Sequence, residues 1–306
     1  MFQKIIYQIA LIFGFFGIGL LARYFGHIKD EGLKDLSNLS INILMPALIF
    51  YSIITQLNKA DLTYSWYLPI LGMISIAFPI LLSLFLSLFM DATNEEKRTF
   101  IYTCSFNNYN FIPIPLVFMF FKEKGLALLF LHNVGCTILY WTIGIWLLSG
   151  KKDKDTFKRI LSPSFVIVLL SVLISYFEFN KYIPNIVLDL SHTLGLAAIP
   201  LSLIVVGGII GRLNLKKIIY DKTLFILIPF RLILMPLLIS FIIQFLGLSG
   251  MIKTIILFVA VMPSAVSTPM MVNLFGGNAK IAASSSSMTT AISIITIPIM
   301  LSFLLQ

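Results

Sequence analysis

Ten apolar runs, separated by short charged clusters, limit what this chain can fold into. They cover residues 5–23, 36–55, 66–89, 99–121, 125–148, 162–179, 187–210, 223–246, 253–275 and 279–304. A helix needs about 20 apolar residues to cross about 30 Å of hydrocarbon, and each run is close to that length. Of the 306 residues, 58% are hydrophobic and 11% are charged, against roughly 45–50% and about 25% in soluble domains. We therefore predict an all-α membrane protein with ten transmembrane helices, placed in the cell membrane.

The composition argues against several other classes of protein. The net charge of +9 comes from basic residues scattered between apolar runs, whereas a nucleic-acid-binding protein gathers them on one face. Cys104 and Cys136 both lie inside apolar runs, so we expect neither a disulfide framework nor a metal site. The first run lacks a small-residue cleavage pattern, so we interpret it as a membrane span rather than a signal peptide. No cofactor motif is present, and none is expected.

The positions of Lys and Arg predict the orientation. Alternating the connections between two sides places six of the 22 basic residues on the side of the termini, namely Lys4, Lys59, Lys122, Lys124, Lys181 and Lys253. Fifteen lie on the opposite side, and Arg231 lies inside a run. Cytoplasmic loops carry the excess of Lys and Arg. Both termini are therefore expected outside the cell.

The chain divides into two halves that repeat. We predict a first five-helix repeat over 1–150, a cytoplasmic connector over 151–161 and a second repeat over 162–306. Pro46 and Pro200 differ by 154 positions, as do Pro115 and Pro269. Because five spans per half is an odd number, the second copy must enter the membrane in the opposite orientation, which makes an inverted repeat. An anionic-lipid site is the alternative reading of the basic connector.

Two runs combine prolines with amide and hydroxyl side chains near mid-membrane. Residues 107–115 read NNYNFIPIP, and residues 262–269 read MPSAVSTP. A proline inside a helix removes a backbone donor and kinks or unwinds the helix. In hydrocarbon, the freed groups cost several kcal/mol each unless protein or a water-filled cavity satisfies them. We therefore predict that spans four and nine are broken at a cavity.

Such a break can bind an anion. Half-helix N-termini direct partial positive charge into the site, and unwound carbonyls accept cations. The substrate-binding candidates come from the two breaks, with one arginine from span eight: Asn107, Asn108, Asn110, Pro113, Pro115, Pro263, Ser264, Ser267, Thr268, Pro269, Asn273 and Arg231. The alternative is that these amides and hydroxyls only hold the helices together.

Ionisable groups inside the predicted spans are few. Every Asp and Glu lies at or near a predicted helix end or loop, so strict antiport through an intramembrane carboxylate is not expected. Arg231 lies about 13 Å along the helix from Lys222. We interpret it as snorkelling to the cytoplasmic face, with an anionic substrate or a carbonyl cluster as the alternative contacts. His132 is interpreted as a hydrogen-bonded structural residue, with proton transfer as its alternative role.

Several motifs resemble, in order and spacing, those of the auxin efflux carrier family, which includes bacterial malate and malonate carriers. They are LMPALIF (44–50), SFNNYNFIPIPLV (105–117), LGLAAIPLSLIVVGG (194–208), MPSAVSTP (262–269) and GGNAKIAASSSSMTT (276–290). The resemblance implies a scaffold domain, a transport domain, crossed broken helices in spans four and nine, and carboxylate-bearing substrates. Asn110 and Pro113 stand where glycine is common in the family, which bears on the substrate.

These observations lead to the hypothesis of a secondary transporter that moves a small organic anion by alternating access. A carrier similar to bile-acid/sodium symporters is the alternative, followed by a channel or sensor. An enzyme is not expected, because the chain lacks HExxH, GxSxG and an intramembrane Asp pair. The expected partners are the anion and membrane lipid, with no nucleic acid, and the sequence leaves a homodimer open.

Overall fold

The protein is helical throughout the residues that the computed structural model describes, which are 2–151, 155–211 and 222–305. The first half contains α1 (Phe2–Tyr24), α2 (Asp30–Leu39), the π-helix η1 (Ser40–Leu44), α3 (Met45–Gln56), α4 (Lys59–Ser65), α5 (Leu68–Ser87), α6 (Asn94–Ser105), α7 (Pro113–Leu139), the π-helix η2 (Tyr140–Gly144) and α8 (Ile145–Ser149). The second contains α9 (Thr156–Ile160), α10 (Pro163–Tyr176), the 3-10 helix η3 (Phe179–Tyr182), α11 (Asn185–Ile210), α12 (Lys222–Pro229), the π-helix η5 (Phe230–Leu234), α13 (Met235–Phe245), α14 (Gly250–Ala260), α15 (Thr268–Phe275) and α16 (Ala279–Leu304).

Helices cover all ten predicted runs. Five continuous helical stretches of the described chain are long and apolar enough to cross a membrane: Asp30–Gln56, Lys59–Ser87, Asn185–Ile210, Lys222–Phe245 and Ala279–Leu304. Shorter apolar helices cover Ala10–Tyr24, Pro163–Tyr176 and Gly250–Ala260. Spans four and five meet inside α7 at a kink, where Lys122 has the non-helical angles φ 54° and ψ −150°. The prediction of an all-helical membrane protein is confirmed, whereas ten crossings in two inverted repeats stay a prediction.

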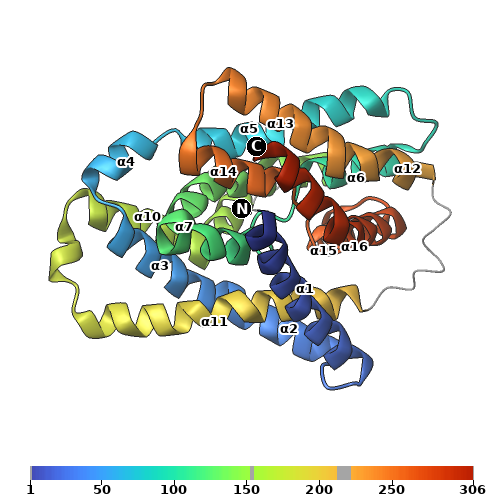
Figure 1. Ribbon diagram of the computed structural model, residues 1–306. Helices are drawn as coiled ribbons and strands as arrows, with labels where there is room; N and C mark the ends of the chain where they lie inside the picture. The colour runs from blue at the N-terminus through green and yellow to red at the C-terminus, as the bar shows by residue number, and fades with distance from the viewer. Residues whose placement is uncertain (1, 152–154, 212–221, 306) are drawn as a thin grey trace.

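The helices pack in two groups (Figure 1). In one group, α11 packs against α1, α2 and α3, and α10 packs against α3. In the other, α5 packs against α6 and α7, while α16 packs against α6, α12, α13 and α15. Helix α7 also contacts α3 and α10, and α1 contacts α16, so these contacts join the two groups. The halves of the chain are thus interleaved, because each group takes helices from both.

Glycines permit the closest contacts inside each group. A methyl group on Gly135 of α7 would overlap the Pro69 carbonyl of α5, and one on Gly72 of α5 would overlap the His132 carbonyl of α7. A methyl group on Gly207 of α11 would likewise overlap the backbone of Phe16 of α1. Small residues let helix backbones approach in a membrane. These glycines therefore set the spacing of the helices they join.

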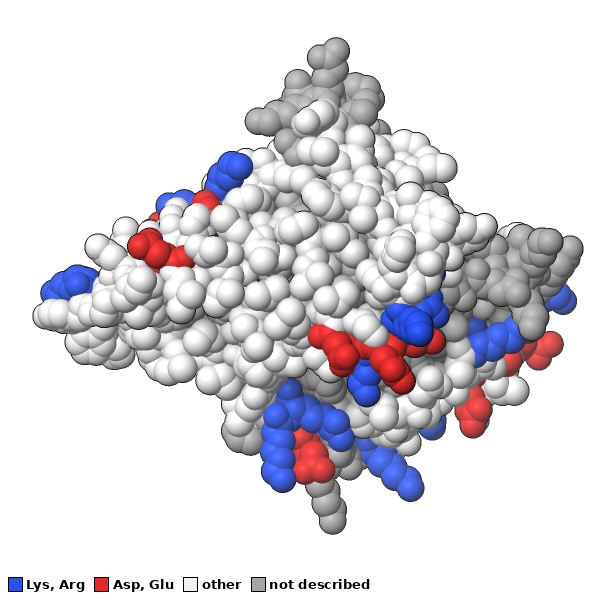
Figure 2. All heavy atoms as spheres, turned by 90° about the horizontal axis from the view of Figure 1, so that it is seen from below, with Lys and Arg blue, Asp and Glu red and all other residues white. Residues whose placement is uncertain are grey.

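Charged side chains lie toward the ends of the helices, with apolar surface between them. Figure 2 shows Lys, Arg, Asp and Glu in two groups separated by a broad band of other residues. Large apolar side chains are exposed on this fold, including Phe85, Phe225, Phe241 and Phe303. Exposed apolar surface of this extent fits contact with lipid tails rather than water. Part of the basic connector, 152–154, and the basic segment 212–221 lie outside the described residues.

Candidate functional site

The two breaks meet at the centre of the structure. The helix of span four ends at Ser105 and resumes at Pro113, and that of span nine ends at Ala260 and resumes at Thr268. Between them the backbones pair in antiparallel fashion at Asn107 and Ser264. The Asn108 N–H donates to the Pro263 carbonyl at 2.8 Å, and the Ala265 N–H donates to the Phe106 carbonyl at 2.9 Å. Each unwound segment therefore supplies the backbone partners that the other needs in hydrocarbon.

Side chains strengthen this crossing. Asn107 Nδ2 donates to the Val259 carbonyl at 2.7 Å, and Ser264 Oγ donates to the Thr103 carbonyl at 2.9 Å. The serine-rich helix α16 packs behind the crossing, where Ser286 Oγ donates to the Ala265 carbonyl at 2.9 Å. These two hydroxyls and one amide hold helices together, which is the alternative to substrate binding that the sequence left open.

The prolines lie where the half-helices begin rather than inside an intact helix. Pro113 is the first residue of α7, and Pro269 is the second residue of α15. A proline is tolerated in the first turn because its missing N–H would have had no helical acceptor there. Pro263 lies in the unwound segment of span nine. The breaks therefore end at prolines, and the N-termini of α7 and α15 both point at the crossing.

Arg231 lies behind the crossing and is 1% exposed. Its guanidinium donates to the carbonyls of Met262, Ala260 and Cys104. The snorkelling interpretation is therefore wrong, because the side chain is buried in protein. Its guanidinium contacts a cluster of carbonyls, which was one of the alternatives.

A cavity of about 230 Å³ lies on the other side of the crossing. One wall is formed by the two breaks and by α7 and η2, and the opposite wall by η1, α3 and the start of α10. Apolar side chains from Ile41, Met45, Phe130, Trp141 and Val168 line most of it. None of the described residues that line it is a Lys, Arg, Asp, Glu or His. An anion here would thus be bound by dipoles and hydrogen bonds rather than by an ion pair.

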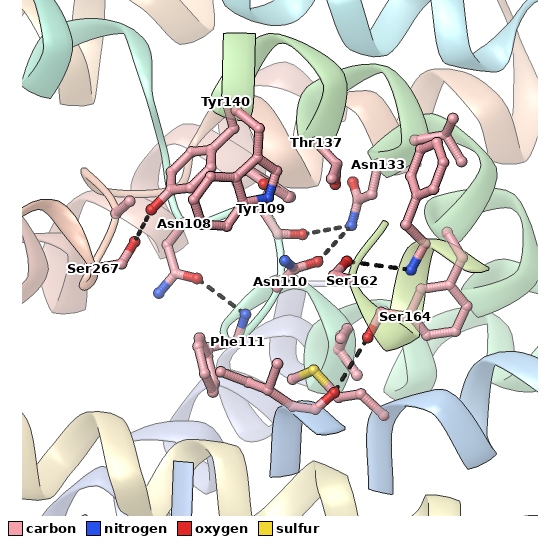
Figure 3. Close-up of a pocket in the computed structure, with 18 of the residues that line it drawn as sticks. Asn108, Tyr109, Asn110, Phe111, Asn133, Thr137, Tyr140, Ser162, Ser164 and Ser267 are labelled. Atoms are coloured by element: carbon pink, nitrogen blue, oxygen red, sulfur yellow. Dashed lines mark hydrogen bonds between the residues drawn. The ribbon is translucent and has the colours of Figure 1, made fainter. Parts of the chain in front are cut away.

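Asn108 lines this cavity and carries a buried amide donor without a partner in the described chain. It is 3% exposed, and its Oδ1 accepts a hydrogen bond from the Phe111 N–H at 3.0 Å (Figure 3). That bond fixes which end of the amide is oxygen, so Nδ2 points away from Phe111. In the described chain Nδ2 has no hydrogen-bond partner. A buried donor left unpaired costs about 1–3 kcal/mol, and a bound carboxylate oxygen would remove that cost.

Further polar groups surround Asn108 (Figure 3). Asn133 Nδ2 donates to the Tyr109 carbonyl at 2.8 Å and to Asn110 Oδ1 at 3.1 Å. The Tyr140 hydroxyl lies 2.9 Å from Ser267 Oγ and ties η2 to the break of span nine. Asn133 and Tyr140 hold the two unwound segments against α7 and η2, and the buried Nδ2 of Asn108 has no partner among the described residues.

The structure separates the predicted residues into two sets. Asn107, Asn108, Asn110 and Ser267 line the cavity. Its described lining does not include Pro113, Pro115, Pro263, Ser264, Thr268, Pro269, Asn273 or Arg231. Asn273 is exposed on α15.

His132 is buried, with Nε2 3.2 Å from Ser75 Oγ and Nδ1 3.2 Å from Asn133 Oδ1. These contacts agree with its interpretation as a hydrogen-bonded structural residue.

Sequence reasoning missed polar residues on both walls of the cavity. Asn133, Tyr140, Ser162 and Ser164 line the cavity but lie outside the two proline-rich segments. Asn133 could have been found, because an amide inside an apolar run needs a partner. Ser162 and Ser164 lie next to the connector and carried no such signal.

Polar side-chain contacts link α7 to its neighbours at the end of the molecule away from the cavity. Glu123 of α7 lies 3.4 Å from His192 Nε2 of α11, whose ring stacks on Tyr51 of α3. Lys124 lies 3.4 Å from Asp61 of α4. These contacts join α7 to α4 and α11 at the end of the molecule that also carries η3. The described cavity lining includes no residue of α4 or η3.

Comparison with known proteins gives the family. The sequence profile of the family described as membrane transport protein matches residues 4–157 and 152–301. An uncharacterised transporter of Methanocaldococcus jannaschii is 27% identical over 287 residues, which cover 92% of each chain. An uncharacterised transporter of Methanothermobacter thermautotrophicus is 24% identical over 288 residues, again 92% of each chain.

Proposed function

From the premise that this chain belongs to the membrane transport protein family, which is the auxin efflux carrier family, we propose that it is a secondary carrier of a small organic anion. The proposed substrate is a carboxylate bound at the crossed breaks of spans four and nine. The two relatives are transporters of unnamed substrate, so the substrate class is argued from the site.

The observation that supports this proposal most is the buried, unpaired Nδ2 of Asn108, a residue that lines a cavity whose described lining holds no charged side chain. The N-termini of α7 and α15 add partial positive charge at the same place. Together they favour a carboxylate over a cation or a sugar. A volume of about 230 Å³ lies below the roughly 300–1,000 Å³ of pockets for drug-sized ligands, which favours a small substrate with a short apolar body.

Alternating access fits the position of the cavity. It lies between the two helix groups and toward the end where the connector joins α10, while the Glu123–His192 contact and the Lys124–Asp61 ion pair lie at the other end. With the connector in the cytoplasm, this arrangement would be an inward-facing state. The opposite state would require these contacts to separate as one helix group moves against the other.

Uptake into proteoliposomes tests the proposed activity. We expect the purified protein to accumulate or exchange at least one radiolabelled mono- or dicarboxylate, in competition with unlabelled substrate and with saturation. Sodium and proton gradients are imposed separately, so that a sodium-coupled carrier is distinguished from other modes. Non-saturating flux would indicate a channel. Transport of organic cations or sugars, with no carboxylate transported, would contradict the proposal.

Cysteine labelling tests the proposed orientation. Lys181 and Lys151 are exposed at opposite ends of the molecule, and the native Cys104 and Cys136 are buried. We expect an impermeant maleimide added to intact cells to label Lys181→Cys and to miss Lys151→Cys, because basic loops stay in the cytoplasm. Wild-type protein supplies the background, and permeabilised cells should label both variants. The reverse pattern would place the termini inside.

A further inference from the structure

The two breaks leave backbone carbonyls without their helical donors. The Cys104 carbonyl would ordinarily accept from the Asn108 N–H, which instead donates to Pro263. The Ala260 carbonyl would accept from the Ser264 N–H, which instead lies 3.2 Å from Thr289 Oγ1. Cys104 and Ala260 stand in the last turns of α6 and α14. The carbonyl ends of two helices, each with partial negative charge, therefore meet at one place.

The Arg231 guanidinium occupies that place. Nε donates to the Met262 carbonyl at 3.0 Å, Nη2 to the Ala260 carbonyl at 3.1 Å and Nη1 to the Cys104 carbonyl at 3.4 Å. A guanidinium has five N–H donors in a fixed fork, so one group reaches both helix ends. Nowhere in the described chain is an Asp or Glu buried. The helix ends thus supply the compensating charge for Arg231.

We propose that Arg231 is a covalently attached counter-cation that takes the place of a dissociable ion at the crossing. Carbonyls of unwound helices and half-helix C-termini form sites for coupling cations in transporters. In this chain the carbonyl site is filled by a side chain that cannot leave, so the crossing stays neutralised at every stage. Combined with the proposed function, this means that transport needs no sodium bound here.

Chemical rescue tests this role in a form that needs no substrate. We compare the thermal unfolding of purified wild type, Arg231→Ala and Arg23→Ala in detergent, with low concentrations of guanidinium chloride or choline chloride. Arg231→Ala should lower Tm by roughly 10 °C, because it strips three buried carbonyls of their donor. Guanidinium, but not choline, should restore at least half of that loss. Arg23, whose partner Asp30 is largely exposed, should show neither effect.

Two further variants keep the test decisive if Arg231→Ala does not fold. Arg231→Lys retains the positive charge with different geometry, whereas Arg231→Gln retains a long polar donor without charge. A higher Tm for the lysine variant supports a counter-cation. A glutamine variant that is as stable as the lysine variant, or an alanine variant that guanidinium does not rescue, would overturn the proposal.

The same proteins test whether the crossing binds sodium. Replacing sodium by choline should leave the Tm of wild type unchanged, and sodium should raise the Tm of Arg231→Ala, because the emptied carbonyls can then accept a small cation. The inference would be contradicted if sodium raised the Tm of wild type and no longer did so when residue 231 is neutral. Failure of uptake alone would bear on the proposed substrate and not on this stability result.

Discussion

Asn108→Asp should reduce carboxylate uptake by roughly 100-fold while the protein remains folded. The substitution removes the unpaired Nδ2 donor of a residue that lines the cavity and puts a carboxylate oxygen in its place. A hydrogen bond to a charged group contributes about 1.5–3 kcal/mol, and each 1.4 kcal/mol is tenfold in affinity, so loss of the bond and repulsion of the anion both act. The Phe111 N–H still has an oxygen acceptor at 108, which should preserve the turn.

The measurement is initial uptake over a range of substrate concentrations, together with Tm. Asn273→Asp is the matched control, because Asn273 lies in the other predicted segment but is exposed on α15, and its uptake should equal that of wild type. If Asn108→Asp unfolds at a much lower temperature yet transports with unchanged affinity, Asn108 serves to hold the helices together and the substrate binds elsewhere.

Gly135→Ala should cause the largest loss of stability among single methyl additions at glycines of the α5–α7 contact. The new Cβ would overlap the Pro69 carbonyl, which is backbone and cannot rotate away. The two helices must therefore separate, which loosens the closest contact inside that group. We expect a fall in Tm of roughly 10 °C, and Gly135→Val should yield mostly aggregated protein in size-exclusion chromatography.

Gly14→Ala is the control for this prediction. A methyl group on Gly14 of α1 would meet no atom within 4 Å, and alanine favours a helix over glycine by up to about 1 kcal/mol. Its Tm should match or slightly exceed that of wild type. Equal Tm values for the Gly135→Ala and Gly14→Ala variants would mean that the α5–α7 contact relaxes at little cost.

Local chemistry made the helical spans and the broken segments predictable. The length of an apolar run, the charges that bound it and the prolines inside it act on the backbone within a few residues. For this reason the ten runs coincide with helices and the breaks lie next to the predicted prolines. Asn107, Asn108, Asn110 and Ser267 were found because polar side chains are conspicuous in an apolar run.

Only the tertiary structure decided which groups meet across the fold. Arg231 is bonded to carbonyls that lie 29, 31 and 127 positions away along the chain. The wall opposite the breaks comes from η1, α3 and α10, whose apolar faces look alike in sequence. The sequence by itself determined where the helices form and break, since those choices depend on each segment alone. The cavity and the place of the buried charge depend on how helices with similar apolar surfaces pack, which close contacts at particular residues such as Gly135 decide.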